Sequence, residues 1–451
     1  MTLFPTRRAY AAFASAFICF AVYASLIPFN ARPLALGDAV DVFRAAMTRW
    51  PSRVSRPDVL ANILLFVPIG FTLTGALLVD RSRHWRLVVA APMLVVLISI
   101  IASAGAEFVQ TFTQDRLSTP VDVASQTVGC LIGIGAWMLA GPALTDWVRR
   151  TLASAPNDRL PRVLAAYTLG WMFVNLAPFD ITLDVGDLGR RVRSGEIALL
   201  ANYGPGAPST RLVWDATAEI LGALPLGVAG LIAFPPGKVR SRVMVVAIGL
   251  AIVMLTEIAQ VFIRSHAAIV GDAVLGGVGV TLGVWIGSVG IQPGSVVPPS
   301  ASPRPWSPAI AAMLLWCIVL GLYHWQPYDF STDGHLVRSK LARISMVPFA
   351  GYARGRWINA LNDILTKVSL AAPLGVIAAF VFRRLTTPSA VVVGLWTMLF
   401  LTIFAIVEFG QLFVTTRNPD PTDILTGTVA AVGGLLTGYW LSPGRSTRSR
   451  P

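Results

Sequence analysis

The chain alternates between long apolar runs and shorter polar connections. A run of about 20 apolar residues is long enough to cross the hydrocarbon core of a bilayer as an α-helix. Twelve such runs are present, so the pattern predicts an all-α polytopic membrane protein with about twelve transmembrane helices. The runs cover 9–27, 60–79, 87–110, 121–140, 163–178, 216–234, 243–263, 270–290, 309–325, 361–381, 389–413 and 422–441.

Short motifs divide the runs into three groups of four. A Pro-aromatic-Asn/Asp motif ends the first run of each group, at Pro28, Pro178 and Pro327. A fixed period of this kind indicates tandem copies of one structural unit. We therefore expect three four-helix repeats, 1–150, 151–291 and 309–451, with a Pro/Ser-rich linker at 292–308. A Pro-x-Gly motif in the second run of each repeat supports the division, at Pro68, Pro225 and Pro373.

Composition agrees with a membrane protein. Hydrophobic residues make up 55% of the chain and charged residues 13%, whereas soluble domains carry about 25% charged residues. The net charge of +13 is carried mostly by arginines at the ends of apolar runs, where they orient spans and meet anionic lipid. We expect membrane lipids as partners and no nucleic acid. The three cysteines lie inside apolar runs and suggest neither a metal site nor disulfides.

The arginine distribution also predicts an orientation. Basic residues flank the first run, the connections between second and third runs, the joins between repeats and the tail. By the positive-inside rule, both termini are then cytoplasmic, and the remaining connections face outward. The longer connections between first and second runs are basic as well, which weakens this signal. In the first of them Val40, Phe43, Met47 and Trp50 recur at helical spacing, which indicates an amphipathic helix on the outer surface.

The connection between the third and fourth runs of each repeat carries the most specific motif. A Glu-x-x-Gln pair ends the third run, an Arg follows, and an Asp begins the fourth run 15 residues after the Glu. Three residues apart on a helix, the Glu and Gln share one face. The turn then allows the Asp to approach the Glu and the Arg to reach either carboxylate. The ligand-binding candidates are Glu107, Gln110, Arg116, Asp122, Glu257, Gln260, Arg264, Asp272, Glu408, Gln411, Arg417 and Asp423.

These hairpins admit a functional and a structural interpretation. Ionisable groups at membrane depth are expensive and are functional candidates. Alternatively, Thr119-Pro120 and Asp420-Pro421 are typical of helix N-termini, with an acid beside the dipole. In that case the Arg ties the turn together, and the Glu and Gln lock the third run to its neighbours.

Secondary candidates precede each Pro-x-Gly motif. An Asp lies ten residues before the proline, where N-capping is the favoured interpretation, and four residues later the repeats diverge to Asn, Glu and Lys. Glu219 and Lys367 could pair between repeats, or Lys367 could pair with Asp363 one turn earlier, which is simpler. The six positions are Asp58, Asn62, Asp215, Glu219, Asp363 and Lys367.

The first repeat resembles the VanZ-like family. Asn62 to Gly70, then Glu107-Phe-Val-Gln110, Arg116 and Asp122 to Gly129 carry the resemblance. That family is named for a bacterial teicoplanin-resistance protein, and its members are small four-span membrane units. The third repeat is similar but has Lys367 for the asparagine, and the second is the most divergent. The resemblance implies a multi-pass protein of the bacterial inner membrane.

From these observations we expect a binding protein without covalent chemistry of its own. The outward-facing hairpins and the basic segments beside them would bind headgroups of envelope lipids or a glycopeptide, with a possible role in glycopeptide resistance. One alternative is a proton-coupled transporter or lipid flippase in which Glu107, Glu257 and Glu408 carry protons. Another is a membrane enzyme acting on lipid phosphates. No catalytic residue, cofactor or metal site is predicted, because no nucleophile elbow, phosphate loop or metal-ligand spacing is present.

Overall fold

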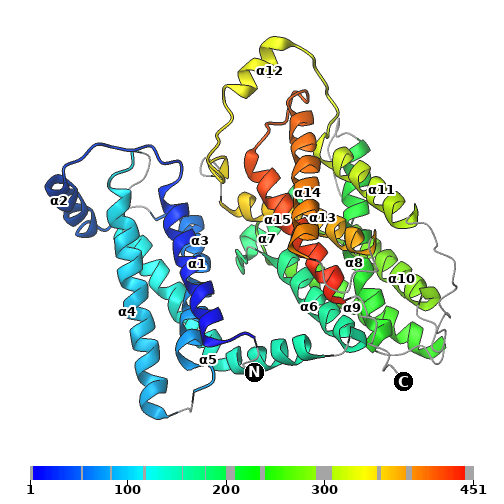
Figure 1. Cartoon of the computed structure of the whole chain (residues 1–451), viewed down its shortest axis with the longest axis horizontal. Helices are drawn as coiled ribbons and strands as arrows, with labels where there is room; N and C mark the ends of the chain where they lie inside the picture. Colours follow the sequence, from blue (N-terminus) through cyan, green and yellow to red (C-terminus); the bar gives the residue numbers. More distant parts are fainter. Residues whose placement is uncertain are drawn as a thin grey trace. The chain divides into compact units, whose positions relative to one another are not determined.

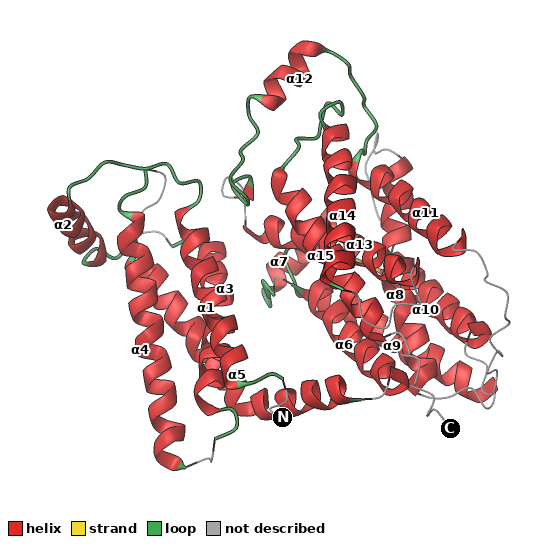
Figure 2. Cartoon of the chain, in the orientation of Figure 1, coloured by secondary structure: helices red, strands yellow, loops and turns green. Residues whose placement is uncertain are grey.

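The computed structural model describes residues 4–51, 54–81, 84–114, 118–154, 156–177, 179–199, 209–233, 239–290, 307–352, 357–381 and 389–441. These residues form an all-α polytopic membrane protein, in which helices account for nearly all regular structure (Figures 1 and 2). The predicted linker at 292–308 lies almost entirely outside the described residues.

The chain divides into two compact units. Unit 1 contains residues Met1–Ser154 and Ser345–Ala360, and unit 2 contains Ala155–Ile344 and Leu361–Pro451. The first repeat therefore lies in unit 1, together with a short segment of the third repeat. The phenol of Tyr23 donates to the carbonyl of Pro348 at 2.9 Å, and the ring of Phe20 packs edge-on against Phe349.

The first repeat contains five helices. Four are the predicted spans and one, α2, is the predicted amphipathic helix between the first two of them. Span α3 packs against α1, α4 and α5, and Phe43 of α2 packs edge-on against Phe108 of α4. The helices are α1 Arg7–Leu26, α2 Leu36–Met47, α3 Arg56–Leu78, α4 Trp85–Gln110 and α5 Pro120–Ala153.

The second and third repeats follow the same order. Each has a short helix between its first and second spans, and the second repeat adds a two-residue parallel pairing in which Ile197 faces Ala268. The sequence pattern did not predict these strands. The elements are α6 Pro156–Leu176, α7 Val185–Ser194, β1 Ile197–Ala198, α8 Ser209–Ala233, α9 Val239–Val261, β2 Ala268–Ile269, α10 Val270–Gly290, α11 Ser307–His324, α12 Gly334–Leu341, α13 Trp357–Val381, α14 Ala390–Gln411 and α15 Pro421–Leu441.

All twelve predicted runs are helical. Nine of the helices in the described residues are long and apolar enough to cross a membrane. The other three runs correspond to α6, α8 and α11, of which α11 is apolar but shorter. The pattern of apolar residues therefore located every helix. That these three helices also cross the membrane stays a prediction.

The second and fourth spans of each repeat pack closely through glycines. A Cβ atom on Gly129 of α5 would overlap the backbone carbonyl of Ile63 on α3, and one on Gly70 would overlap that of Cys130. Small residues allow helix backbones to approach closely in a membrane. The glycine of each Pro-x-Gly motif has this role, since Gly227 faces Val280 and Gly375 faces Ala431 in the same way.

Candidate functional site

The glutamate at the end of each third span binds the turn that follows it. Its carboxylate accepts a hydrogen bond from the backbone N–H twelve residues later in all three repeats. This N–H belongs to the segment just before the fourth span, where helix geometry provides no partner. The three contacts are Thr119 N to Glu107 Oε2 at 3.2 Å, Ile269 N to Glu257 Oε2 at 3.3 Å and Asp420 N to Glu408 Oε2 at 3.0 Å.

The N-capping interpretation holds for two of the three hairpins. Thr119 caps α5, and its hydroxyl donates to Asp122 Oδ2 at 2.8 Å. The carboxylate of Asp420 accepts from Thr422 N at 2.8 Å at the start of α15. The second repeat has no such side-chain cap, and there β2 leads directly into α10. The glutamate contact is thus the feature that all three hairpins share.

The aspartate that begins each fourth span lies beside the divergent position of the second span. In the first repeat Asn62 donates to Asp122 Oδ1 at 2.6 Å and accepts from Gln126 at 3.2 Å. In the third repeat Lys367 donates to Asp423 Oδ1 at 2.5 Å and also forms an ion pair with Asp363. The expected pairing of Lys367 with Asp363 is confirmed, and Asp423 joins it.

In the second repeat the same position is acidic. The carboxyl groups of Glu219, Glu257 and Asp272 lie close enough to interact electrostatically, and Asp215 lies beside them. The three repeats therefore place a neutral amide, a carboxyl group and an ammonium group at one structural position.

None of the secondary aspartates is found as an N-cap among the described residues, since Ser55 is the N-cap of α3, and only Asp58 lies where an acid can pair with a helix dipole. Asp58 lies in the first turn of α3. Asp215 and Asp363 lie well inside α8 and α13, which begin at Ser209 and Trp357, so the N-terminal interpretation is wrong for these two. The helix starts were misplaced because the segments 209–215 and 357–363, which mix polar and apolar residues, are helical as well.

The predicted contact between the hairpin arginine and the acids is replaced by another arrangement. Arg264 donates to Asp187 Oδ2 at 2.8 Å, and Arg417 donates to the carbonyl of Gln326 at 2.8 Å. Both partners belong to the connection between first and second spans, not to the hairpin. Arg116 lies outside the described residues.

The glutamines have local structural contacts. Gln411 donates to Glu408 Oε1 at 2.8 Å, and Gln260 donates to the backbone carbonyl of Asn175 on α6 at 3.0 Å. Gln110 is buried at the end of α4. These contacts support the view that the Glu and Gln lock the third span to its neighbours.

The Pro-aromatic motif joins the end of the first span to the hairpin. Its aromatic residue has a positive φ in each repeat, at Phe29, Phe179 and Tyr328, a conformation that non-glycine residues adopt only when the surrounding structure enforces it. The chain then pairs antiparallel with the hairpin turn. The bridges are Ala31 with Thr113, Ile181 with Ile263 and Phe330 with Val414.

Two buried cations that the sequence did not single out complete this junction. Arg191 of α7 and Lys340 of α12 are 4% and 6% exposed. Arg191 donates to the carbonyl of Val261 at 2.5 Å, and Lys340 donates to that of Arg417 at 2.8 Å. Both satisfy carbonyls at or after the end of the third span, where a cation also opposes the helix dipole. Their common position, thirteen residues after the proline of the Pro-aromatic motif, was the available signal.

Hydrogen bonding, charge and desolvation in this junction shift two pKa values. The hydroxyl of Thr182 and the guanidinium groups of Arg190 and Arg264 lower the pKa of the Asp187 carboxyl. Desolvation lowers the pKa of Lys340. Asp187 is therefore ionised at neutral pH and holds α7 against the hairpin.

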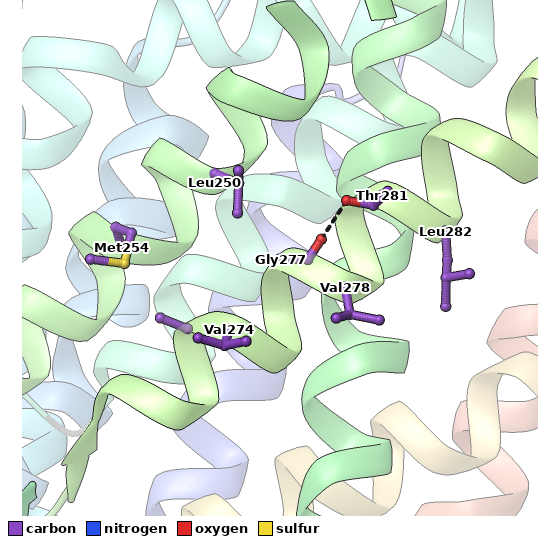
Figure 3. A pocket seen from close by; sticks show the side chains of 8 residues that line it. Leu250, Met254, Val274, Gly277, Val278, Thr281 and Leu282 are labelled. Carbon is purple, nitrogen blue, oxygen red and sulfur yellow. Dashed lines mark hydrogen bonds between the residues drawn. The ribbon is translucent and has the colours of Figure 1, made fainter. Parts of the chain in front are cut away.

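Two pockets lie away from these residues. An apolar groove of about 450 Å³ in unit 2 runs between α9 and α10 (Figure 3), and its Thr281 hydroxyl donates to the carbonyl of Gly277 at 2.9 Å. A pocket of about 180 Å³ in unit 1 lies beside Asp80 and Arg149, whose bidentate ion pair lowers the pKa of Asp80. Neither pocket contains a predicted site residue, and no cluster of metal-ligating side chains occurs within the described part of the chain.

Comparison with protein families gives one match. The model of the family described as VanZ/LLP1 matches residues 1–141 and residues 309–442, which together make up more than half of the chain. The matched regions hold the first and third repeats, and the divergent second repeat lies outside them. A comparison with curated proteins and one with solved structures give no match. With its repeated hairpins and multiple apolar helices, the chain belongs to the VanZ/LLP1 family.

Proposed function

We propose that the protein binds anionic headgroups of envelope lipids at the outer face of the bacterial inner membrane. In each repeat separately, the binding surface would consist of the short helix, which is α2, α7 or α12, and the hairpin turn of the same repeat. We call this surface the junction surface.

The observation that carries the proposal is the side-chain pattern of α7. Val185 and Val192 are 81% and 57% exposed, and Arg190 and Arg193 are exposed beside them. Exposed apolar side chains alternating with arginines are typical of a helix that lies in the membrane interface. There the apolar groups enter the acyl region, and each guanidinium can bind a phosphate bidentately.

The other two short helices share this character. Leu36 of α2 is exposed, as is Trp50 shortly after the helix, and Arg44 and Arg49 are exposed among them. Near α12 the exposed residues are Leu341, Met346, Arg338 and Arg343. Each repeat thus presents apolar and cationic groups at the same end as its hairpin.

The hairpin acids support the surface indirectly. Glu107, Glu257 and Glu408 hold the turns through backbone contacts. Arg191 and Lys340 are buried and bound to carbonyls. We therefore assign headgroup binding to the exposed arginines.

A lipid-binding measurement tests the proposal. The purified full chain and its Arg190→Gln/Arg193→Gln variant are compared for retention of phosphatidylglycerol against phosphatidylcholine by native mass spectrometry. We expect the variant to retain several-fold less phosphatidylglycerol and an unchanged amount of phosphatidylcholine. The matched control is Arg86→Gln/Arg150→Gln, which removes two exposed arginines from the other end of the first repeat. Equal losses in both variants would show a general charge effect and overturn the proposal.

The glycopeptide version of the proposal has its own test. A deletion strain is complemented with the wild type or with Arg190→Gln/Arg193→Gln, and growth is compared in the presence of teicoplanin. The resistance role predicts that only the wild type restores growth. Identical sensitivity of all strains, including the deletion, would exclude that role.

A further inference from the structure

The interior of unit 1 beneath its hairpin is polar. On α4, Ser99, Ser103 and Glu107 follow one another at intervals of four residues, so they share one helical face. They are 0%, 0% and 1% exposed. This polar face runs from Glu107, at the hairpin, towards the middle of the membrane.

The facing helix α5 presents a matching polar face. Two contacts fix the antiparallel register, because Cys130 Sγ lies 4.0 Å from the carbonyl of Val95 and Glu107 binds the N–H of Thr119. Between these contacts, the register brings Ser99 level with Gln126, and Ser103 level with Asp122.

The second span adds an amide to the same place. Asn62 of α3 binds Asp122 at 2.6 Å and Gln126 at 3.2 Å. We call the set Asn62, Ser99, Ser103, Glu107, Asp122 and Gln126 the polar column.

Three oxygens of the polar column make no hydrogen bond of normal geometry with a described residue, although the Ser99 hydroxyl lies beside the Cys130 thiol. They are Ser99 Oγ, Ser103 Oγ and Oε1 of Gln126, whose side chain is 2% exposed. A buried polar atom without a partner is costly, and in folded proteins such atoms are usually satisfied by internal water. A buried water makes about three hydrogen bonds, and the column offers donors and acceptors from three helices.

The other two repeats fill the equivalent positions with apolar side chains or glycine. Phe404 and Phe400 occupy the places of Ser103 and Ser99 in the third repeat, and Phe404 packs against Gly427, the counterpart of Gln126. In the second repeat the counterparts are Val253, Gly249 and Gly276. Compared with the third repeat, the first repeat has serine for phenylalanine on α4 and glutamine for glycine on α5, so polar groups replace an apolar contact.

We propose that the polar column is a binding site for a file of water molecules. From Glu107 to Ser99 it extends about 12 Å along α4, a large part of the distance to the bilayer centre. The water satisfies the three oxygens and hydrates the polar face of α4 below Glu107. The second and third repeats have glycine or apolar side chains at these positions and lack the hydroxyl and amide groups of the site.

Radiolytic hydroxyl-radical labelling of the full chain in lipid nanodiscs tests this inference. Hydroxyl radicals form from water and react close to where they form, and cysteine is the most reactive side chain towards them. Cys130, buried at the inner end of the column, is compared with the less buried Cys317 of α11. We expect Cys130 to be oxidised several-fold faster than Cys317, the reverse of their order of exposure. If oxidation follows exposure, with Cys130 slower, the column is dry and the inference is wrong.

A variant series locates the water. Gln126→Leu removes the amide at similar volume, and Ser103→Ala removes a hydroxyl. Each should lower the rate of Cys130 oxidation several-fold and leave that of Cys317 unchanged. The matched control is Thr127→Val on the neighbouring face of α5, whose hydroxyl donates to Val123 within its own helix. An unchanged Cys130 rate in both column variants would contradict the site.

Discussion

At the scale of single residues, position 367 decides the electrostatics of the third repeat. Lys367 is 14% exposed and pairs with Asp423, which is 9% exposed. In the first repeat the equivalent residue is Asn62, whose uncharged amide donates a hydrogen bond to Asp122. In the first and third repeats this position therefore holds a group that donates to the aspartate, whereas the second repeat has Glu219 there.

This arrangement predicts the outcome of two substitutions. Lys367→Met leaves two carboxylates without their ammonium partner, and breaking a buried ion pair costs about 3 kcal/mol of unfolding free energy. Lys367→Asn reproduces the donor of the first repeat and should cost less. Thermal or denaturant unfolding in detergent measures both. An equal cost for the two variants would mean that donation to Asp423 is not what Lys367 contributes.

The sequence located the motif residues, but it predicted only some of their partners, such as Asp363 for Lys367. The constant Glu-to-Asp spacing located all three hairpins because it reflects a fixed turn length. It did not show that Arg264 and Arg417 turn towards the preceding connection. That contact depends on where the Pro-aromatic motif returns the chain, and residue spacing within the hairpin does not encode it.

At the scale of elements, the hairpin is a turn closed by a carboxylate. We expect that the glutamate closes the turn as a hydrogen-bond acceptor and that its negative charge is not required. In the third repeat Glu408→Gln retains an acceptor for the N–H of Asp420, whereas Glu408→Ala leaves that part-buried N–H without this acceptor. We expect the alanine variant to lose about 1–3 kcal/mol of unfolding free energy and the glutamine variant to lose less.

Unfolding measurements on Glu408→Gln and Glu408→Ala test whether the turn needs an acceptor or a negative charge. If glutamine were as damaging as alanine, the negative charge itself would be required, and the functional interpretation of the glutamates would regain support.

The contact between second and fourth spans makes a separate prediction. Gly129→Ala on α5 forces a methyl group against the carbonyl of Ile63, and such overpacking typically costs about 1–3 kcal/mol. Gly135→Ala on the same helix meets no atom within 4 Å and should be neutral or slightly stabilising. Comparison of their unfolding midpoints checks the packing, and matching midpoints would contradict it.

At the scale of the whole molecule, the repeats share a plan but differ in their interiors. The hydrophobic period predicted the twelve runs because burial in lipid demands it. Three of the resulting helices, α6, α8 and α11, are not among the nine whose described residues are long and apolar enough to cross a membrane. If one of these helices does not cross the membrane, every hairpin after it lies on the opposite side of the membrane.

Four spans per repeat return the chain to the same side, so all three hairpins should face outward. Single cysteines at Gln114, Ser265 and Thr416, all exposed turn residues, are introduced into a chain that lacks its native cysteines. A membrane-impermeant thiol reagent should label all three on intact cells. A cysteine at His84, in the connection between α3 and α4, should react only after lysis. Protection of any one hairpin would show that a preceding helix does not cross.

The segment 345–360 has a consequence for how the protein is made. It belongs to the third repeat by sequence, yet it completes unit 1 through the contact of Tyr23 with Pro348. A ribosome synthesises the chain from its N-terminus, so unit 1 reaches its final contacts only after more than three hundred residues have been translated. The first repeat is therefore incompletely packed along α1 until the third repeat has been synthesised.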